Sequence, residues 1–194
     1  MVDVEVIDDP AAAACLLDPV RAELLAELTE PASAATLAAR VGLTRQKVNY
    51  HLNTLQRHHL VSVAEERQWG GLTERVLIAS AASYVVSPTA LGAVAADPAR
   101  STDRLSAGHL IALAARVVRE VGELWQSARR TDKRLATLSI DTTIRFRTAS
   151  ERADFTRDLS TAIATLAARY HDDTAAGGRP HRLFVAAYPA PPTD

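Results

Sequence analysis

The sequence predicts an α+β fold in two parts, and three observations lead to this prediction. Apolar residues recur at helical spacing in three short segments between residues 18 and 58. Two alternating segments follow at 60–79, separated by a pair of glycines. A polar stretch at 97–105 then precedes a long amphipathic segment and a strand–helix–strand pattern. We therefore expect one domain at 15–88 and a second at 98–194.

Each of the three short helices has sequence signals at its ends. Asp18, Ser33 and Thr44 are N-cap residues, and Pro19 suits the first helical position after Asp18. Gly42 ends the second helix. The apolar faces consist of Leu24, Leu25 and Leu28 in the first helix and Val48, Leu52 and Leu55 in the third.

A β-hairpin is expected directly after the third helix. Leu60–Val63 and Glu74–Ala79 are its strands, and residues 67–71 are expected to form the turn, with Gly70-Gly71 at its tip. Residues 83–86 have the composition of a further short strand, which we expect to add to a sheet of the second domain. Residues 1–17 are interpreted as an acidic arm that runs into an Ala-rich stretch.

The second domain is expected to consist of a long helix and a small α/β unit. Residues 106–131 carry apolar side chains at helical spacing, and residues 138–147 alternate between apolar and polar side chains. Thr148 and Glu151 have the spacing of a capping box for the next helix, and 182–188 is an apolar strand. Two strands with one crossover helix form a parallel pair if they are adjacent. Such a thin layer is expected to pack on the long helix or on a second subunit.

Composition excludes several classes of function. The single cysteine, Cys15, forms no intramolecular disulfide and no cysteine-only metal cluster. The acidic first residues are unlike a signal peptide, and no segment has membrane length without charges, so we expect a cytoplasmic protein without a membrane partner. No Gly-rich loop follows a strand and no nucleophile elbow occurs, so we expect neither catalysis nor a cofactor.

Charge is distributed unevenly although the formal net charge is only -1. Residues 31–64 contain no Asp or Glu, whereas Arg40, Arg45, Lys47 and Arg57 all lie there. A surface that binds phosphates excludes acidic side chains, and a single helix fits the major groove of DNA. Three helices followed by a hairpin therefore indicate a winged helix-turn-helix that binds double-stranded DNA. The predicted contact residues are Thr44, Arg45, Gln46, Lys47, Asn49, Tyr50 and Asn53 on the third helix and Arg67 and Arg75 in the wing.

The chain resembles the ArsR-type winged helix-turn-helix regulators over residues 15–85. The resemblance lies in DPVRAELLAEL, in ATLAARVGLTRQKVNYHLNTLQRHHLV and in the wing that ends RQWGGLTERVLIA. It implies a homodimer that binds a pseudo-palindromic operator and releases it when an effector binds. His59 stands where the family has Gly, a position where His tolerates a left-handed backbone.

Metal sensing is not expected. The paired cysteines and the His/Asp pair of the metal-sensing branch have no counterpart here, so the effector is expected to be other than a metal, such as a small organic molecule. We interpret His58-His59, and His171 beside Asp172-Asp173, as structural residues.

The sequence favours a homodimeric repressor, with a protein–protein adaptor built on a winged-helix scaffold as the alternative. The long helix is interpreted as a dimerisation helix, although it also suits the lining of a ligand pocket. Asp141, Arg145 and Arg147 are interpreted as a solvated sheet face, with an effector site as the alternative. Tyr50 suits the edge of the core as well as a DNA contact, and Arg57 is interpreted as a solvated charge.

Overall fold

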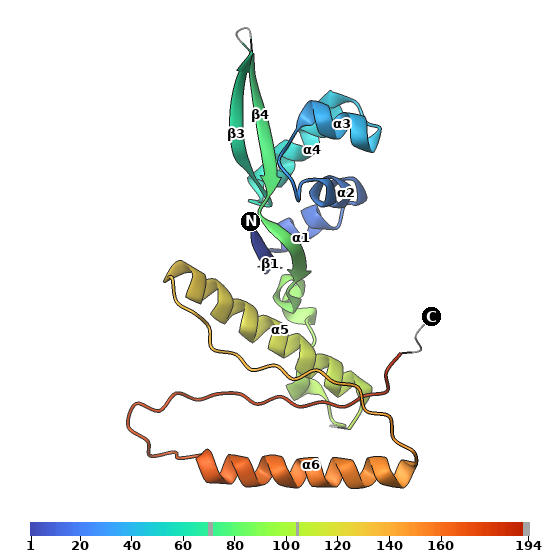
Figure 1. The fold of residues 1–194 in the computed structure, drawn as a ribbon, viewed down its shortest axis with the longest axis vertical. Coiled ribbons are helices and arrows are strands. Elements are labelled where there is room, and N and C mark those ends of the chain that lie inside the picture. Colours follow the sequence, from blue (N-terminus) through green and yellow to red (C-terminus); the bar gives the residue numbers. More distant parts are fainter. Residues whose placement is uncertain (70–71, 104, 192–194) are drawn as a thin grey trace. The chain divides into compact units, whose positions relative to one another are not determined.

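The computed structural model describes residues 1–69, 72–103 and 105–191. Helices and strands are mixed, as the sequence predicts, and the contacts divide the chain into Met1–Leu135 and Ala136–Asp194 (Figure 1). The long helix α5 (Ala107–Arg130) belongs to the first of these units, whereas the sequence analysis grouped it with the C-terminal part. The domain bounds 15–88 and 98–194 stay a prediction.

Four helices build the core of the first unit: α1 (Pro10–Leu16), α2 (Pro19–Glu27), α3 (Ala34–Val41) and α4 (Arg45–Arg57). The three predicted caps are present. Asp18 accepts the N–H of Arg21, Ser33 that of Thr36 and Thr44 that of Lys47. Gly42 ends α3 in the left-handed conformation. The largest fully buried apolar side chains are Leu24, Leu28, Leu37, Val48, Leu55 and Leu60.

A three-stranded sheet packs beside these helices in the order β2 (Ala32–Ser33), β4 (Leu72–Ala79) and β3 (Val61–Trp69). Strands β3 and β4 are antiparallel and form the predicted wing, with a register shift between Val63 and Glu65. The prediction that the turn begins at Arg67 was wrong, because Arg67 and Gln68 continue β3 and pair with Glu74 and Thr73 of β4. The predicted glycine tip at 70–71 lies outside the described residues. His59 has a φ of 59°, so it adopts the left-handed turn expected of it before Leu60.

The N-terminal residues form a strand, so the prediction of an acidic arm was wrong. Strand β1 (Val2–Ile7) pairs in parallel with β5 (Ala81–Val86), and this pairing corrects the expectation that 83–86 joins a C-terminal sheet. The hydroxyl of Tyr84 donates to the carbonyl of Leu60 at 3.0 Å, which fastens β5 to the helical core.

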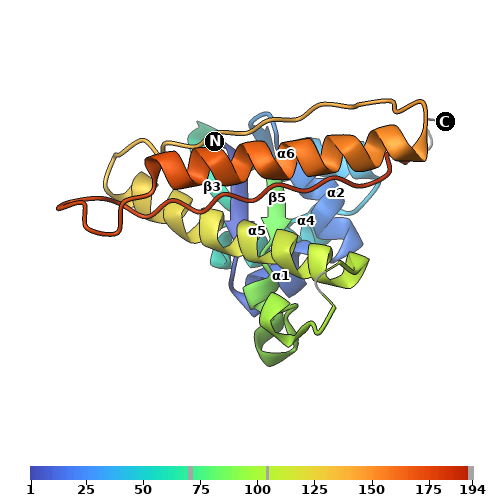
Figure 2. The ribbon, with the colours of Figure 1, turned by 90° about the horizontal axis from the view of Figure 1, so that it is seen from below.

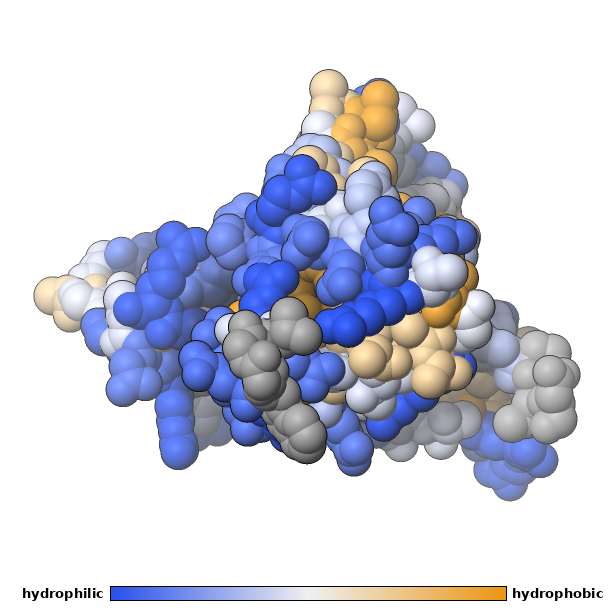
Figure 3. Space-filling model, turned by 90° about the horizontal axis from the view of Figure 1, so that it is seen from above, coloured by the Kyte–Doolittle hydropathy of each residue, from blue (hydrophilic) through white to orange (hydrophobic). Residues whose placement is uncertain are grey.

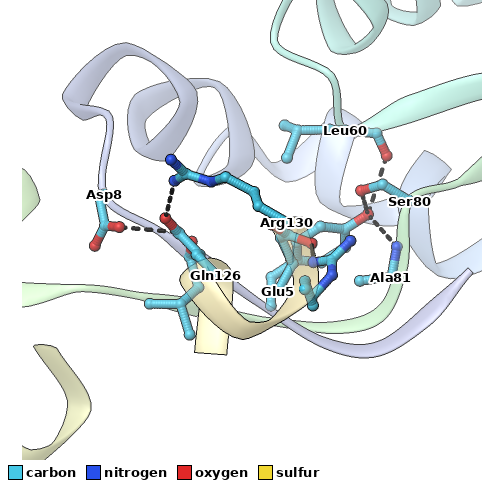
Figure 4. A network of polar contacts seen from close by, with 10 residues as sticks. Glu5, Asp8, Leu60, Ser80, Ala81, Gln126 and Arg130 are labelled. Carbon is cyan, nitrogen blue, oxygen red and sulfur yellow. Dashed lines mark hydrogen bonds and ion pairs between the residues drawn. The ribbon is translucent and has the colours of Figure 1, made fainter. Parts of the chain in front are cut away.

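Two 3₁₀ segments, η1 (Pro88–Val94) and η2 (Pro98–Arg100), connect β5 to α5. Helix α5 lies close against β1. A Cβ at Gly122 would lie 2.8 Å from Val6 Cγ1, so the absence of a side chain at Gly122 permits this approach. Gln126 donates to the carbonyl of Val6 at 3.0 Å and to the carboxylate of Asp8 at 2.9 Å (Figure 4). Arg129 pairs with Glu5 at 2.7 Å.

The C-terminal unit contains one helix, α6 (Ala149–Tyr170), among its described residues. The predicted cap is present, because Thr148 accepts the N–H of Glu151 at 3.1 Å. The predicted strands at 138–147 and 182–188 do not form. Both segments are extended. They run parallel to each other and opposite to α6, but they are not paired with each other (Figures 1 and 2). Alternating side chains favour an extended backbone, whereas a strand also requires a neighbour in register.

Candidate nucleic-acid interface

Helix α4 has one buried and one exposed face, as the sequence predicts. Val48, Leu52 and Leu55 are at most 2% exposed and pack into the core. On the opposite side Arg45, Gln46, Lys47, Tyr50 and Asn53 are exposed, and Asn49 is half-buried. The rotation of the helix therefore presents a polar face, of which Tyr50 (64% exposed) is a surface residue.

The N-terminal end of α4 concentrates positive charge. Arg45 and Lys47 lie in its first turn, where the helix dipole also carries its positive end. The other two cations of residues 31–64, a stretch without acidic residues that we call the acid-free window, have partners. Arg40 pairs with Glu27 at 3.2 Å, and Arg57 donates to Thr54 Oγ1 at 3.1 Å. The first turn of α4 is thus the part of this window that is best suited to a phosphate.

Behind this exposed face lies a histidine that the sequence analysis did not single out. His51 is 8% exposed, and its Nδ1 has no hydrogen-bond partner among the described residues. Burial lowers the pKa of His51, with Arg21 and Lys47 acting in the same direction and Asp18 opposing them. His51 is therefore a core residue, and its burial favours the uncharged imidazole.

Arg75 connects the wing to α4. Its guanidinium donates to Asn53 Oδ1 and to Gln56 Oε1, both at 3.2 Å. Gln56 was missed as a site residue, although its position three residues after Asn53 places it on a neighbouring part of the helix surface. Because Arg only donates, the amide oxygens of both side chains face the wing. The predicted phosphate contact of Arg75 is untested, and in this structure the residue orients two side chains of α4.

The two wing strands carry three acidic residues and two arginines, so their formal charge is -1, whereas a wing that binds phosphate is expected to be positive. Arg67 pairs with Glu65 at 2.9 Å, and this hydrogen bond lowers the pKa of Glu65 and raises that of Arg67. Glu66 and Glu74 also lie on the two wing strands. Figure 3 views the molecule from the wing end and shows mostly hydrophilic side chains, with a few apolar patches among them. Phosphate attraction is therefore expected to come from α4 more than from the wing.

Other kinds of site were considered in the described part of the chain. Within it, no three or more His, Cys, Asp or Glu side chains gather as metal ligands. No helix there is both long and apolar enough to cross a membrane. Burial raises the pKa of the Cys15 thiol.

One hollow of about 260 Å³ is lined by small and charged residues from Gly92 to Arg119, and a second by Glu5, Gln126, Arg129 and Arg130. Organic ligands prefer a mostly apolar lining, which neither hollow has.

Comparison with known proteins identifies a helix-turn-helix domain in the N-terminal part of the chain. Residues 16–64 match a protein family described as a helix-turn-helix domain. The chain matches no curated protein.

Among solved structures, the chain is similar to NolR from Sinorhizobium fredii, with 25% identity over 37% of this chain and 67% of that chain and a TM-score of 0.31. Reduced HlyU from Vibrio cholerae N16961 is 24% identical over 36% of this chain and 70% of that chain, with a TM-score of 0.31. Residues 16–64 of this chain, which include α2, α3 and α4, thus carry a helix-turn-helix domain.

Proposed function

We propose that this protein is a sequence-specific DNA-binding transcription regulator that acts in the cytoplasm and reads the major groove with α4. The observation that carries the proposal is the exposed polar face of α4, which lies opposite a fully buried apolar face. A helix held in this way fits the major groove, and its Arg, Asn and Gln side chains are the types that bind base edges. Arg45 and Lys47 at its N-terminal end supply phosphate contacts.

The hydrogen bond from Arg75 restricts the base edges that Asn53 can recognise. The guanidinium orients the amide of Asn53 so that Oδ1 faces the wing and the amide nitrogen donates outward. A bidentate contact to adenine needs both a donor and an acceptor from the same amide, whereas N7 and O6 of guanine are both acceptors. Asn53 is therefore proposed to donate to a purine acceptor and to read adenine less strictly than a free amide would.

We further propose a homodimeric repressor that resembles the ArsR type and responds to a small effector other than a metal. Two recognition helices about one helical turn apart, ~34 Å, would then bind a pseudo-palindromic operator. Exposed apolar residues on α5, namely Ile111, Leu124 and Trp125, support a role for this helix in association.

Fluorescence anisotropy with duplexes from the DNA upstream of the protein's own gene tests the proposal. We expect Arg45→Ala combined with Asn49→Ala to weaken specific binding at least 10-fold, since each base contact contributes ~1–3 kcal/mol. Arg179→Ala is the matched control, because it removes the same charge from an exposed segment outside the helix-turn-helix and should leave binding unchanged. Affinity should also fall steeply with salt. Specific binding that the double variant leaves unchanged would contradict DNA recognition by α4, and the absence of any salt-dependent DNA affinity would favour an adaptor.

A further inference from the structure

The C-terminal unit does not bury a core of its own. None of the described residues from 136 to 191 is buried, and the apolar side of α6, represented by Phe155, Leu159 and Ile163, is only half-buried. The large apolar side chains that remain exposed are Leu138, Ile140, Ile144, Leu166, Tyr170, Leu183, Phe184, Val185 and Tyr188. At about 150–200 Å² per fully exposed side chain, their exposed fractions amount to on the order of 1000 Å². A standard interface buries ~800 Å² per partner, so this surface is large enough for a stable one.

The backbone of this unit is equally unpartnered. Among the described residues, 136–146 and 183–191 make no backbone–backbone hydrogen bond, although both segments are extended (Figures 1 and 2). Apolar extended segments with open N–H and C=O groups are templates for strand pairing. The two extended segments are therefore suited to pair with further β-strands.

The side-chain patterns place the two segments at different positions in such a sheet. Residues 138–147 alternate and carry Asp141, Arg145 and Arg147 on one face, as an outer strand does. Residues 183–188 (LFVAAY) contain no charge and are apolar on both faces, as an inner strand does. An inner strand needs two neighbours. The two segments are unpaired in the single chain, but the crossover through α6 allows 138–147 to become one neighbour when the sheet forms, and the unit offers no other extended segment of this kind among its described residues.

We propose that the second neighbour is residues 183–188 of a second copy of this chain, so that two C-terminal units share one four-stranded sheet. A two-fold axis perpendicular to the sheet makes the central pair antiparallel and places both α6 helices on the same face. Because 183–188 is uncharged, two copies meet without repulsion, and the charged outer strands discourage further growth of the sheet. The inference rests on the proposed homodimer and assigns to this unit the contact on which the dimer depends, with the exposed apolar residues of α5 as an additional contact.

Single cysteines placed along 183–188 in the full chain test the central pair. In a Cys15→Ala background, each of the six positions is changed in turn and oxidised with copper phenanthroline. Directly opposed residues in an antiparallel pair have Cα atoms ~4.5–5.5 Å apart, which is within the range of a disulfide. We expect a covalent dimer at the one or two positions nearest the axis. Ala176→Cys, in an exposed turn, is the control and should stay monomeric under denaturing conditions.

A proline substitution tests the backbone pairing. Val185→Pro removes an N–H donor from the inner strand, and light scattering should show the mass falling from twice the chain mass of 20.8 kDa to a single chain. Ala190→Pro, in the proline-rich tail, should leave the dimer intact. A wild-type monomer, or a dimer that forms no crosslink at any of the six positions, overturns the shared sheet. Failure of the α4 double variant to weaken DNA binding would instead count against the proposed function, so the two failures are distinguishable.

Discussion

Replacing Gly122 with Ala tests how closely α5 packs against the N-terminal strand. Two effects of opposite sign compete. Ala stabilises a helix interior by about 1 kcal/mol relative to Gly. The new Cβ, however, would lie 2.8 Å from Val6 Cγ1 and 3.3 Å from Val6 Cβ, inside the ~3.5–4.0 Å of a normal carbon contact. Overpacking of this kind costs ~1–3 kcal/mol. We therefore expect a net loss of up to ~2 kcal/mol in the free energy of unfolding.

Thermal and urea denaturation followed by circular dichroism measure this loss, with Gly108→Ala as the control. Gly108 lies in the same helix, but its added Cβ would meet only Ser106 Oγ at 3.9 Å, so this change should be neutral or stabilising. Adding Val6→Ala to Gly122→Ala removes the methyl group at 2.8 Å and should restore most of the stability. If Gly122→Ala raised the melting temperature as Gly108→Ala does, α5 would not be packed on β1 as described.

Three further predictions follow from the residues around α4. Because the folded protein lowers the pKa of His51, the unfolded chain binds the proton more readily, so stability should fall as pH drops below the ordinary value of 6.5 and stay level above it. His51→Gln should flatten that part of the stability–pH curve, and an unchanged slope would contradict the assignment. Thr44→Ala removes the cap of α4 and should cost ~1 kcal/mol in urea denaturation, whereas Thr44→Ser should cost little. Arg75→Ala should weaken specific DNA binding about 10-fold and alter base preference opposite Asn53, with little change in melting temperature because the contacts are exposed. Unaltered base preference in a panel of substituted duplexes would argue against the orienting role of Arg75.

Local pattern was enough to predict the helix-turn-helix in detail. The faces and caps of α2, α3 and α4 depend on residues three or four positions apart, and the sequence displays those directly. Strand β1 was missed although Val2, Val4 and Val6 alternate with Asp3 and Glu5, because the acidic residues were read as an arm rather than as one face of a strand.

Sequence patterns do not predict contacts between residues that are far apart in the chain. Arg75 lies 22 residues after Asn53, and Gln126 lies 118 residues after Asp8, so no periodicity connects either pair. The same limit explains the C-terminal unit. Alternation at 138–147 predicts an extended backbone, which is observed, but the identity of a strand's neighbour depends on the tertiary or quaternary structure.

The near-neutral net charge is compatible with the proposed DNA binding because residues 31–64, which include α4, contain no acidic residue, although the adjoining wing strands carry Glu65, Glu66 and Glu74. In the first unit, Glu5 and Asp8 of the N-terminal segment contact Arg129 and Gln126 of α5, at the end opposite the tip of the wing (Figure 1). These acids stabilise the attachment of α5, and both lie outside the stretch at 31–64 that is proposed to face DNA. The salt dependence of binding should accordingly follow the cations on α4, with each lost phosphate contact reducing the slope by about 0.9. Removing Lys47 should therefore reduce that slope, whereas removing Arg129 should weaken the packing of α5 and leave the slope unchanged.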